Sequence, residues 1–416
     1  MVERDCLFLE AALSVPPSAV RYRLGRIVTE RAGTSKVVQI EDGEVSLDHL
    51  VAEAFCVVEP RPDIHTEIVR KWKSRGEVGT KLALGVFTLR WEGSTFEAVV
   101  ARWVEGFDHR QALFLTGADG AALDRFVVAA LDTTYVPRRS VLAFSHSCFQ
   151  QDRALYAAAQ EASWEDIVLP GDLGSRLREE VTSFLGAREL YAKYAVPYKR
   201  GILLTGPPGN GKTHCVRLLV KEAALPTIYV KSFAARYEDE DANISRVFER
   251  ARAIAPCLLV LEDLDSLVRP HCLSVFLNEL DGLRSDTGIL SVATTNHPER
   301  LDPALRERPS RFDRKYHLDL PALEERRRYL EHWNQKLERD LRIDGAAVTN
   351  IVERTEGMSF AFLKELVVSA LSRWMTRPKH DSMGALALAE LDGLRSTWTK
   401  VEDGEVSRKS EPPSER

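Results

Sequence analysis

The sequence is poor in cysteine, has no long apolar run and carries little net charge. Six cysteines occur in 416 residues, but none form a CxxC pair and none combine with histidine at a spacing that suits zinc. No apolar run approaches the roughly 18 residues that a transmembrane helix needs. The net charge is only -5, with a pI near 6.1, which argues against a chain-wide binder of nucleic acid or anionic membrane. These absences predict a soluble protein of a reducing, cytoplasmic compartment.

The amino terminus also lacks the features of a secretory signal. Residues 1–18, MVERDCLFLEAALSVPPS, place acids where a basic segment is needed, and charge interrupts the short apolar run. The chain is long enough, at 44% hydrophobic residues, to bury the cores of two or three domains. We found no internal repeat.

Residues 1–150 have the pattern of an α+β domain. Residues 81–104 predict two strands around Glu92 and Gly93, residues 111–117 predict a further strand, and residues 121–131 have helical apolar spacing. No motif in this part carries recognisable chemistry. Three of its histidines, His65, His109 and His146, are interpreted as surface or core residues and not as metal ligands.

The pattern changes near residue 150. From 151 to 320, strand and helix signals alternate, which predicts a P-loop-type α/β domain with a parallel sheet covered by helices on both faces. Residues 321–400 have only helical signals and predict a separate helical lid subdomain. Residues 401–416 are polar, charged and proline-containing, so we expect a disordered tail.

One glycine-rich loop is the strongest chemical signal. Residues 206–213, GPPGNGKT, follow a buried strand and open a helix, which is the context that the G-x-x-x-x-G-K-[ST] motif requires. Glycines let backbone amides face a phosphate, and the helix N-terminus adds partial positive charge. The pattern predicts that Lys212 binds the β and γ phosphates of a nucleotide and that Thr213 ligates Mg²⁺. The predicted nucleotide-contacting set is Gly206, Pro207, Pro208, Gly209, Asn210, Gly211, Lys212, Thr213 and His214.

A second signal follows about fifty residues downstream. Residues 257–263, CLLVLED, form an apolar strand that ends in two adjacent acids, Glu262 and Asp263. In an open parallel sheet the carboxyl ends of the strands face the bound ligand. We expect Glu262 to support the metal ion and Asp263 to polarise the attacking water. The competing interpretation, a surface turn with solvated acids, fits poorly with so continuous an apolar run.

Together these motifs resemble the AAA+ ATPases, and within them the AAA clade proper. The resemblance spans residues 164–400 and rests on five segments in the family's order. They are GPPGNGKT for Walker A, LLVLEDLD for Walker B, ATTNHPERLDPAL for sensor 1, RPSRFD for the arginine-finger segment and TEGMSFAFLKEL for the lid helix. The glutamate-first order LED is closest to the branch that contains the mitochondrial respiratory complex III assembly ATPase.

The resemblance implies roles for further residues. Asp263 would be the catalytic base, with Glu262 on the metal and Asn296 as sensor 1. Arg308 and Arg311 would reach the γ-phosphate bound by a neighbouring subunit, which implies a homo-oligomeric ring of six or seven subunits. Asp166, Ile167 and Ala361 stand where the family contacts adenine. ATP and Mg²⁺ are therefore the expected cofactors.

The sequence also departs from the family's pattern. Where a pore loop carries an aromatic–hydrophobic–glycine step, residues 234–245 read AARYEDEDANIS, with Tyr237 as the one aromatic residue and acids at 238–241. The segment SLVRPHC leaves little room for a second pore loop. No transmembrane helix precedes the ATPase, so a membrane anchor is not expected. Phe360 replaces a glycine of the lid.

The residues therefore favour an ATP-hydrolysing ring that remodels or translocates a macromolecular client, expected to be a protein selected by residues 1–150. An ATP-dependent assembly switch or scaffold remains open, because the acidic loop casts doubt on threading. A DNA-acting motor is disfavoured, because the sequence has no basic patch interleaved with aromatic residues.

Overall fold

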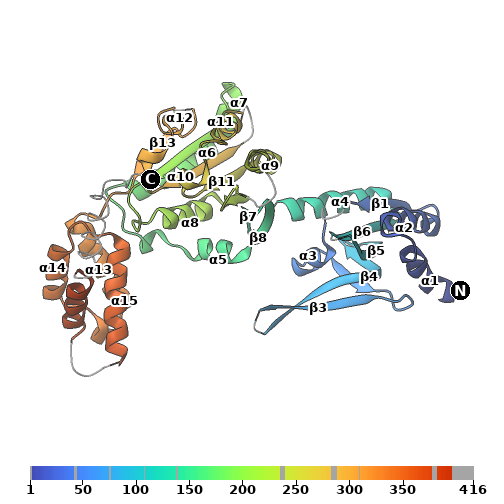
Figure 1. The fold of residues 1–416 in the computed structure, drawn as a ribbon, viewed down its shortest axis with the longest axis horizontal. Helices are drawn as coiled ribbons and strands as arrows, with labels where there is room; N and C mark the ends of the chain where they lie inside the picture. Colours follow the sequence, from blue (N-terminus) through green and yellow to red (C-terminus); the bar gives the residue numbers. More distant parts are fainter. Residues whose placement is uncertain are drawn as a thin grey trace, which may run out of the picture. The chain divides into compact units, whose positions relative to one another are not determined.

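The computed structural model describes residues 2–41, 45–74, 76–106, 108–136, 139–234, 239–282, 288–308, 310–376 and 382–395. The chain divides into two compact units, Met1–Arg138 and Arg139–Arg416 (Figure 1). The predicted tail at 401–416 and the loop aromatic Tyr237 lie outside the described residues.

The first unit is built on an antiparallel sheet with helices on both faces. The strand order is β1-β6-β5-β4-β2, and β3 pairs with β4. The strands are β1 (Lys36–Ile40), β2 (Val57–Pro60), β3 (Glu67–Ser74), β4 (Glu77–Trp91), β5 (Ser94–Glu105) and β6 (Asp108–Gly117). The helices are α1 (Val2–Leu13), α2 (Pro17–Ala32), α3 (Leu47–Ala52) and α4 (Gly120–Tyr135).

Alternation along β4 explains the two faces. Phe87 belongs to the core that α3 and α4 cover, with Leu50 and Phe126. Its neighbour Val86 belongs to the core under α1 and α2, because successive side chains of a strand point to opposite faces. The predicted hairpin is confirmed: Trp91 pairs with Ser94, and Glu92 and Gly93 both have positive φ, as a two-residue hairpin turn requires. The strand predicted at 111–117 and the helix predicted at 121–131 are confirmed in β6 and α4.

The second unit contains a seven-stranded sheet in the order β13-β9-β12-β11-β10-β7-β8. All neighbours are parallel except β7 and β8, so the predicted parallel sheet is confirmed. The strands are β7 (Val141–Ser145), β8 (Cys148–Asp152), β9 (Lys199–Thr205), β10 (Thr227–Val230), β11 (Cys257–Leu261), β12 (Ile289–Thr295) and β13 (Arg314–His317). Every residue of β11 and β12 is buried, which explains the continuous apolar run of β11.

The unit boundary differs from the one expected at residue 150. The β7–β8 hairpin extends the second unit's sheet, because Leu142, Ala143 and Phe144 pair with β10. The division lies at Arg138/Arg139. Sequence pattern alone does not reveal this, since an apolar strand followed by a tight turn suits either sheet.

Helices cover both faces of this sheet. Side chains of α5 (Arg153–Glu161), α6 (Leu173–Gly186) and α8 (Lys212–Ala223) share one core with alternate residues of β9 and β11. On the other face, α9 (Glu240–Ala253) packs against α11 (Leu273–Asp281), with the Phe248 and Phe276 rings 5.6 Å apart in an edge-on contact. Short elements complete this part: η1 (Trp164–Asp166), α7 (Arg188–Lys193), α10 (Leu264–Leu267), η2 (Pro298–Arg300) and α12 (Pro303–Arg306).

The residues after 321 form a helical lid, as predicted. Its helices are α13 (Leu323–Lys336), α14 (Gly345–Arg354), α15 (Phe360–Thr376) and a final helix over 383–395, with η3 (Arg339–Leu341) between the first two (Figure 1). They surround a core of their own that includes Leu330, Ile351 and Leu366. Across the part of the chain that the structure describes, no helix is both long and apolar enough to cross a membrane.

Candidate active site

The glycine-rich loop connects β9 to α8. Gly201 to Leu204 of β9 are buried, and α8 begins at Lys212 directly after the loop. Gly206 has a φ of +134°, and a Cβ there would lie 2.0 Å from the carbonyl oxygen of Leu318. Gly209 has a φ of +81°, and a Cβ there would lie 2.7 Å from the Cβ of Ala361 on the lid. These two positions require glycine because of both the backbone conformation and the close approach.

Lys212 is buried and lies across its own loop. Its Nζ donates hydrogen bonds to the carbonyl oxygens of Gly206 at 2.6 Å and Pro207 at 2.8 Å. Burial lowers the pKa of Lys212, and the nearby carboxylates of Asp263 and Asp265 oppose that shift. An ammonium group that donates to neutral carbonyls is well placed to exchange them for an anionic phosphate, which binds it more strongly.

The ends of β11 and β12 bring the acid and the amide together. Asp263, just after β11, has a φ of +49°, and its backbone N–H donates to Thr294 Oγ1 at 3.0 Å. Asn296, just after β12, donates from Nδ2 to Asp263 Oδ1 at 3.1 Å. The two strands are adjacent and parallel, so their carboxyl ends meet at one edge. A left-handed backbone at a non-glycine residue is strained and is found often at functional sites.

Glu262 faces a different neighbour. Its Oε2 accepts a hydrogen bond from the hydroxyl of Tyr229 on β10. Burial, together with this carboxylate, raises the pKa of Tyr229 well above its ordinary value. The second oxygen, Oε1, is buried, and the described residues include no hydrogen-bond partner for it. A buried carboxylate oxygen without a donor fits the requirement of a metal ion or a metal-bound water.

A cavity of about 430 Å³ lies between the glycine-rich loop, the strand ends and the lid, and we call it the P-loop cavity. Most of the predicted set line it: Asp166, Ile167, Pro208, Gly209, Gly211, Lys212, Thr213, His214, Asp263, Asn296 and Ala361. Residues that the sequence reasoning did not assign to the site also line it: Val168, Thr294, Tyr329, Phe360 and Lys364.

Six members of the predicted set are not among the described residues that line the cavity: Gly206, Pro207, Asn210, Glu262, Arg308 and Arg311. Gly206 and Pro207 contribute the carbonyl oxygens that hold Lys212. Asn210 is buried, and its Oδ1 accepts from the backbone N–H of Phe360 at 3.3 Å, so this residue joins the loop to the lid. Glu262 is directed toward Tyr229, as described above.

The lid contributes one wall through aromatic and charged contacts. Tyr329 on α13 lies against Phe360 on α15, with ring centroids 5.0 Å apart. Asp166 accepts a hydrogen bond from Lys336 at 2.5 Å, and His332 Nε2 lies 3.6 Å from the same carboxylate. Lys336, with smaller effects from His332 and His214, lowers the pKa of Asp166. These contacts join η1 to the lid beside the cavity.

The two arginines of RPSR differ in exposure. The Arg311 side chain is only 4% exposed; its Nη2 donates to Asp281 Oδ2 at 2.7 Å and its Nη1 to the Ala304 carbonyl oxygen at 2.6 Å. Arg308 is 60% exposed and contacts Asp281 at 3.3 Å. Neither is among the described residues that line the P-loop cavity. In this structure Arg311 is therefore bound within its own chain, and Arg308 is the accessible cation of the pair.

Residues 202–320 match the family model described as "ATPase family associated with various cellular activities (AAA)". With the parallel sheet, the glycine-rich loop and the helical lid, this match means that the chain contains an AAA ATPase domain. The family model places this domain among the ATPase families.

Among similar proteins is a putative cell division cycle ATPase of Plasmodium falciparum, 31% identical over 234 residues, covering 52% of this chain and 19% of that protein. An ATP-dependent zinc metalloprotease FtsH of Pirellula staleyi is 32% identical over 269 residues, covering 59% and 37%. The ATPase family gene 2 protein of Saccharomyces cerevisiae is 29% identical over 222 residues, covering 50% and 28%. The chain thus spans well under half the length of each of these relatives.

Proposed function

We propose that this chain is an ATP-hydrolysing AAA+ protein that assembles into a ring and uses hydrolysis to remodel or translocate a macromolecular client, most simply a protein. The observation that carries the proposal is the convergence of Lys212, Thr213, Asp263 and Asn296 on one cavity with the lid as its wall. Phosphoryl transfer to water needs groups that bind the phosphates and groups that activate the attacking water, all within one cavity.

Each residue has a distinct task in this proposal. Lys212 and the loop amides bind the phosphates. Thr213 would hold Mg²⁺ together with Glu262 Oε1, for which the described residues include no hydrogen-bond partner. The bound ion would neutralise charge on the β and γ phosphates. Asp263 accepts the proton of the attacking water, and the hydrogen bond from Asn296 fixes the direction of that carboxylate. Asp166, Ile167 and Ala361 form the wall expected for adenine.

Assembly into a ring is supported by the position of Arg308, which is not among the described residues that line the P-loop cavity. Arg308 is exposed on its loop, so it is available to a nucleotide held by a neighbouring subunit, and an arginine supplied in trans stabilises the charge of the transferring phosphoryl group. Exposed apolar side chains of α7 and the segment after it, Leu190, Tyr194 and Val196, support self-association, since large exposed apolar groups mark interaction sites. A ring of six or seven subunits is the proposed assembly.

The first unit is the proposed client-binding part. The β3–β4 ribbon carries exposed apolar side chains, Ile68, Val69, Trp72 and Val78, whereas both faces of the remaining sheet are covered by helices.

The glutamate-first acid pair supports placing the chain near the branch of the respiratory complex III assembly ATPase. Of the two acids, Asp263, the second, is the one that lines the cavity.

A second function, an ATP-dependent assembly switch, is favoured by one observation. Glu240, at the start of α9, pairs with Arg269 at 2.9 Å and with His271 at 3.2 Å. These residues belong to the two segments that would have to grip a threaded polypeptide. Segments that are paired to each other in this way are less available to bind a threaded polypeptide. In that case ATP-dependent assembly would itself be the function of the protein.

Specific ATPase activity across a wide range of protein concentrations tests the proposal. A ring with shared sites predicts activity per subunit that rises with concentration, together with ATP-dependent assembly in sedimentation. Stimulation by unfolded protein would favour remodelling, whereas assembly that responds to neither protein nor DNA would favour the switch. Concentration-independent activity of a monomer would contradict the shared site.

A further inference from the structure

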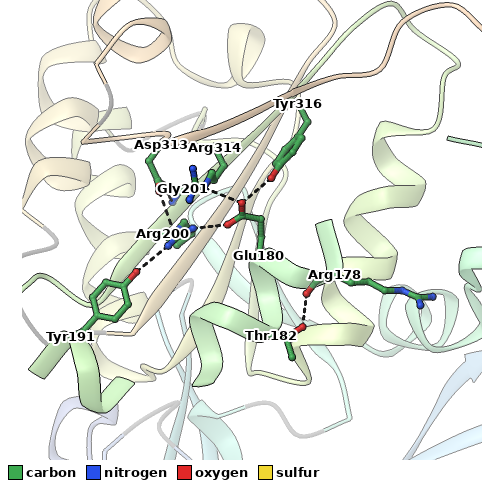
Figure 2. Close-up of polar contacts among 9 residues, drawn as sticks. All are labelled: Arg178, Glu180, Thr182, Tyr191, Arg200, Gly201, Asp313, Arg314 and Tyr316. Carbon is green, nitrogen blue, oxygen red and sulfur yellow. Dashed lines mark hydrogen bonds and ion pairs between the residues drawn. The ribbon is translucent and has the colours of Figure 1, made fainter. Parts of the chain in front are cut away.

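A network of charged side chains joins α6 to the first residues of β9 (Figure 2). Arg200 is at its centre. This residue donates hydrogen bonds to Glu180 at 2.5 Å and to the Tyr191 hydroxyl at 3.1 Å, and its Nε lies 3.2 Å from Asp313. Arg200 and Glu180 are each only 15% exposed, so this pair is shielded from water and holds its geometry more firmly than a surface ion pair does.

Glu180 extends the network to β13. Its other oxygen, Oε1, forms an ion pair with Arg314 Nε at 2.9 Å and accepts a hydrogen bond from the Tyr316 hydroxyl at 2.9 Å (Figure 2). Burial, together with this carboxylate, raises the pKa of Tyr316 to about 12, so the hydroxyl stays protonated and remains a donor. Glu180 is therefore fixed from three sides and in turn fixes Arg200.

Asp313 connects this network to the loop that carries Arg308. Its Oδ1 accepts from the backbone N–H of Gly201 at 2.9 Å. Gly201 has no side chain, and a Cβ there would lie 2.0 Å from the carbonyl oxygen of Arg311. The loop backbone therefore packs directly on the start of β9, and Phe312 between these contacts is fully buried.

Arg308 is the exposed end of a loop held firmly at its base. Arg311 binds Asp281 and the Ala304 carbonyl on one side, and Asp313 binds Arg200 and Gly201 on the other. The described residues that line the P-loop cavity include neither Arg200, Glu180 nor Asp313. A change in the network would therefore displace Arg308 directly. It would affect the nucleotide bound by the same subunit only indirectly.

We propose that Arg200, held by Glu180, is a positioning residue that sets the Arg308 loop through Asp313 and so acts on the ATP bound by the neighbouring subunit. The inference rests on the proposed function, since it requires an arginine supplied in trans. Its physical basis is that a misplacement of about 1 Å of a group that must meet a transition state can lower the rate by about 100-fold.

Mixing two kinds of variant subunit distinguishes a positioning role of Arg200 from a purely structural role. Lys212→Ala subunits lack the phosphate lysine but keep an intact Arg308 loop, whereas Arg200→Met subunits keep an intact P-loop cavity. Each is expected to be weakly active alone. In a random one-to-one mixture, about a quarter of the interfaces combine the intact cavity of one subunit with the intact loop of the other, so activity should recover to about that fraction of wild type.

A reference mixture of Lys212→Ala with Arg308→Ala reports on the trans arginine itself. Recovery in both mixtures supports the positioning role of Arg200. Recovery in the reference mixture alone would overturn that role and leave the proposed function in place. Recovery in neither would refute the trans arrangement, and the inference with it.

A second variant and a control guard against misfolding. Asp313→Asn keeps an acceptor for the Gly201 amide but loses the charge that faces Arg200, and it should also recover in the mixture with Lys212→Ala. Glu179→Gln, one position from Glu180 on the exposed side of α6, should keep wild-type kcat alone. Arg200→Met should lower kcat without weakening binding of a fluorescent ATP analogue. Combined with Arg308→Ala it should add no further loss, because both changes remove the same interaction.

Discussion

Asn296 donates a hydrogen bond from its side-chain amide to the carboxylate of Asp263, with 3.1 Å between Nδ2 and Oδ1. The donor follows β12 and the acceptor follows β11, so the contact depends on the parallel pairing of these strands. This hydrogen bond fixes the orientation of the Asp263 carboxylate at the edge of the P-loop cavity. Oδ1 accepts from Asn296, and Oδ2 is left to bind a water.

Replacing this amide by an acid should disable the site without changing its shape. In Asn296→Asp the donor becomes a second carboxylate that faces Asp263, and like charges raise the pKa of one of the pair. We expect ATP turnover to fall by about 100-fold, as the loss of general-base catalysis typically costs, while a fluorescent ATP analogue still binds. Wild-type turnover in this variant would show that the contact has no catalytic role.

The contact between Tyr229 and Glu262 makes a prediction about stability. Tyr229→Phe removes the donor to a partly buried carboxylate whose other oxygen already lacks a partner in the described structure. We expect the free energy of unfolding to fall by about 1–3 kcal/mol, the usual cost of a buried polar group left unsatisfied. Urea unfolding measures it, with Tyr22→Phe as the control, because Tyr22 is 72% exposed. An equal, small effect in both variants would contradict the assignment.

Substitution of the two arginines of RPSR should have different effects: one should lower activity and the other should lower stability. Arg308→Ala should lower kcat by about 1,000-fold or more, as the loss of an arginine finger does, and leave the melting temperature unchanged because the side chain is 60% exposed. Arg311→Ala should instead destabilise the fold by about 1–3 kcal/mol, since it removes a buried guanidinium and leaves the carbonyl oxygen of Ala304 and the half-exposed Asp281 without their donor. Arg306→Ala, on the same segment, should change neither. Circular dichroism melts and phosphate release give the two readouts, and a stable, inactive Arg311→Ala protein would reverse the assignment.

The same ion pair should respond to acid. The hydrogen bond from Arg311 is the largest cause of a lowered pKa for Asp281. Because the folded-state pKa lies below the unfolded value, the stabilisation is fully present above about pH 4 and is lost as the pH falls through the lowered folded-state value. The difference in unfolding free energy between wild type and Asp281→Asn should be constant from neutral pH to about pH 4 and then shrink. A difference that grows on acidification would have the wrong sign.

Local patterns predicted much of this architecture. The alternation of strands and helices after residue 150 is enough to predict a parallel sheet. The loop at 206–213 identified the phosphate-binding side of the cavity, Pro208, Gly209, Gly211, Lys212 and Thr213, because a phosphate cradle is continuous in sequence. Asp263 was predictable because the acid pair ends the apolar strand β11, whereas Asn296 was predicted from the family resemblance of the segment around it.

What the sequence left undetermined depends on contacts between distant segments. Pairing with β10, eighty-odd residues away, decides that β7 and β8 belong to the second unit. The burial of Arg311 depends on Asp281, and the direction of Glu262 depends on Tyr229, a strand residue that apolar periodicity treats as core. Tyr329 and Lys364 reach the cavity only because the lid packs over the loop, and nothing in their own helices distinguishes them from other lid residues.

Single-turnover hydrolysis of ATP tests the central claim, that Asp263 is the catalytic base, most directly. Asp263→Asn and Glu262→Gln would be compared with wild type at saturating ATP and across a range of Mg²⁺ concentrations. The account predicts that Asp263→Asn binds ATP but hydrolyses it about 100- to 10,000-fold more slowly at every Mg²⁺ concentration, whereas Glu262→Gln regains activity as Mg²⁺ is raised. Near-normal hydrolysis by Asp263→Asn, with Glu262→Gln inactive throughout, would contradict it.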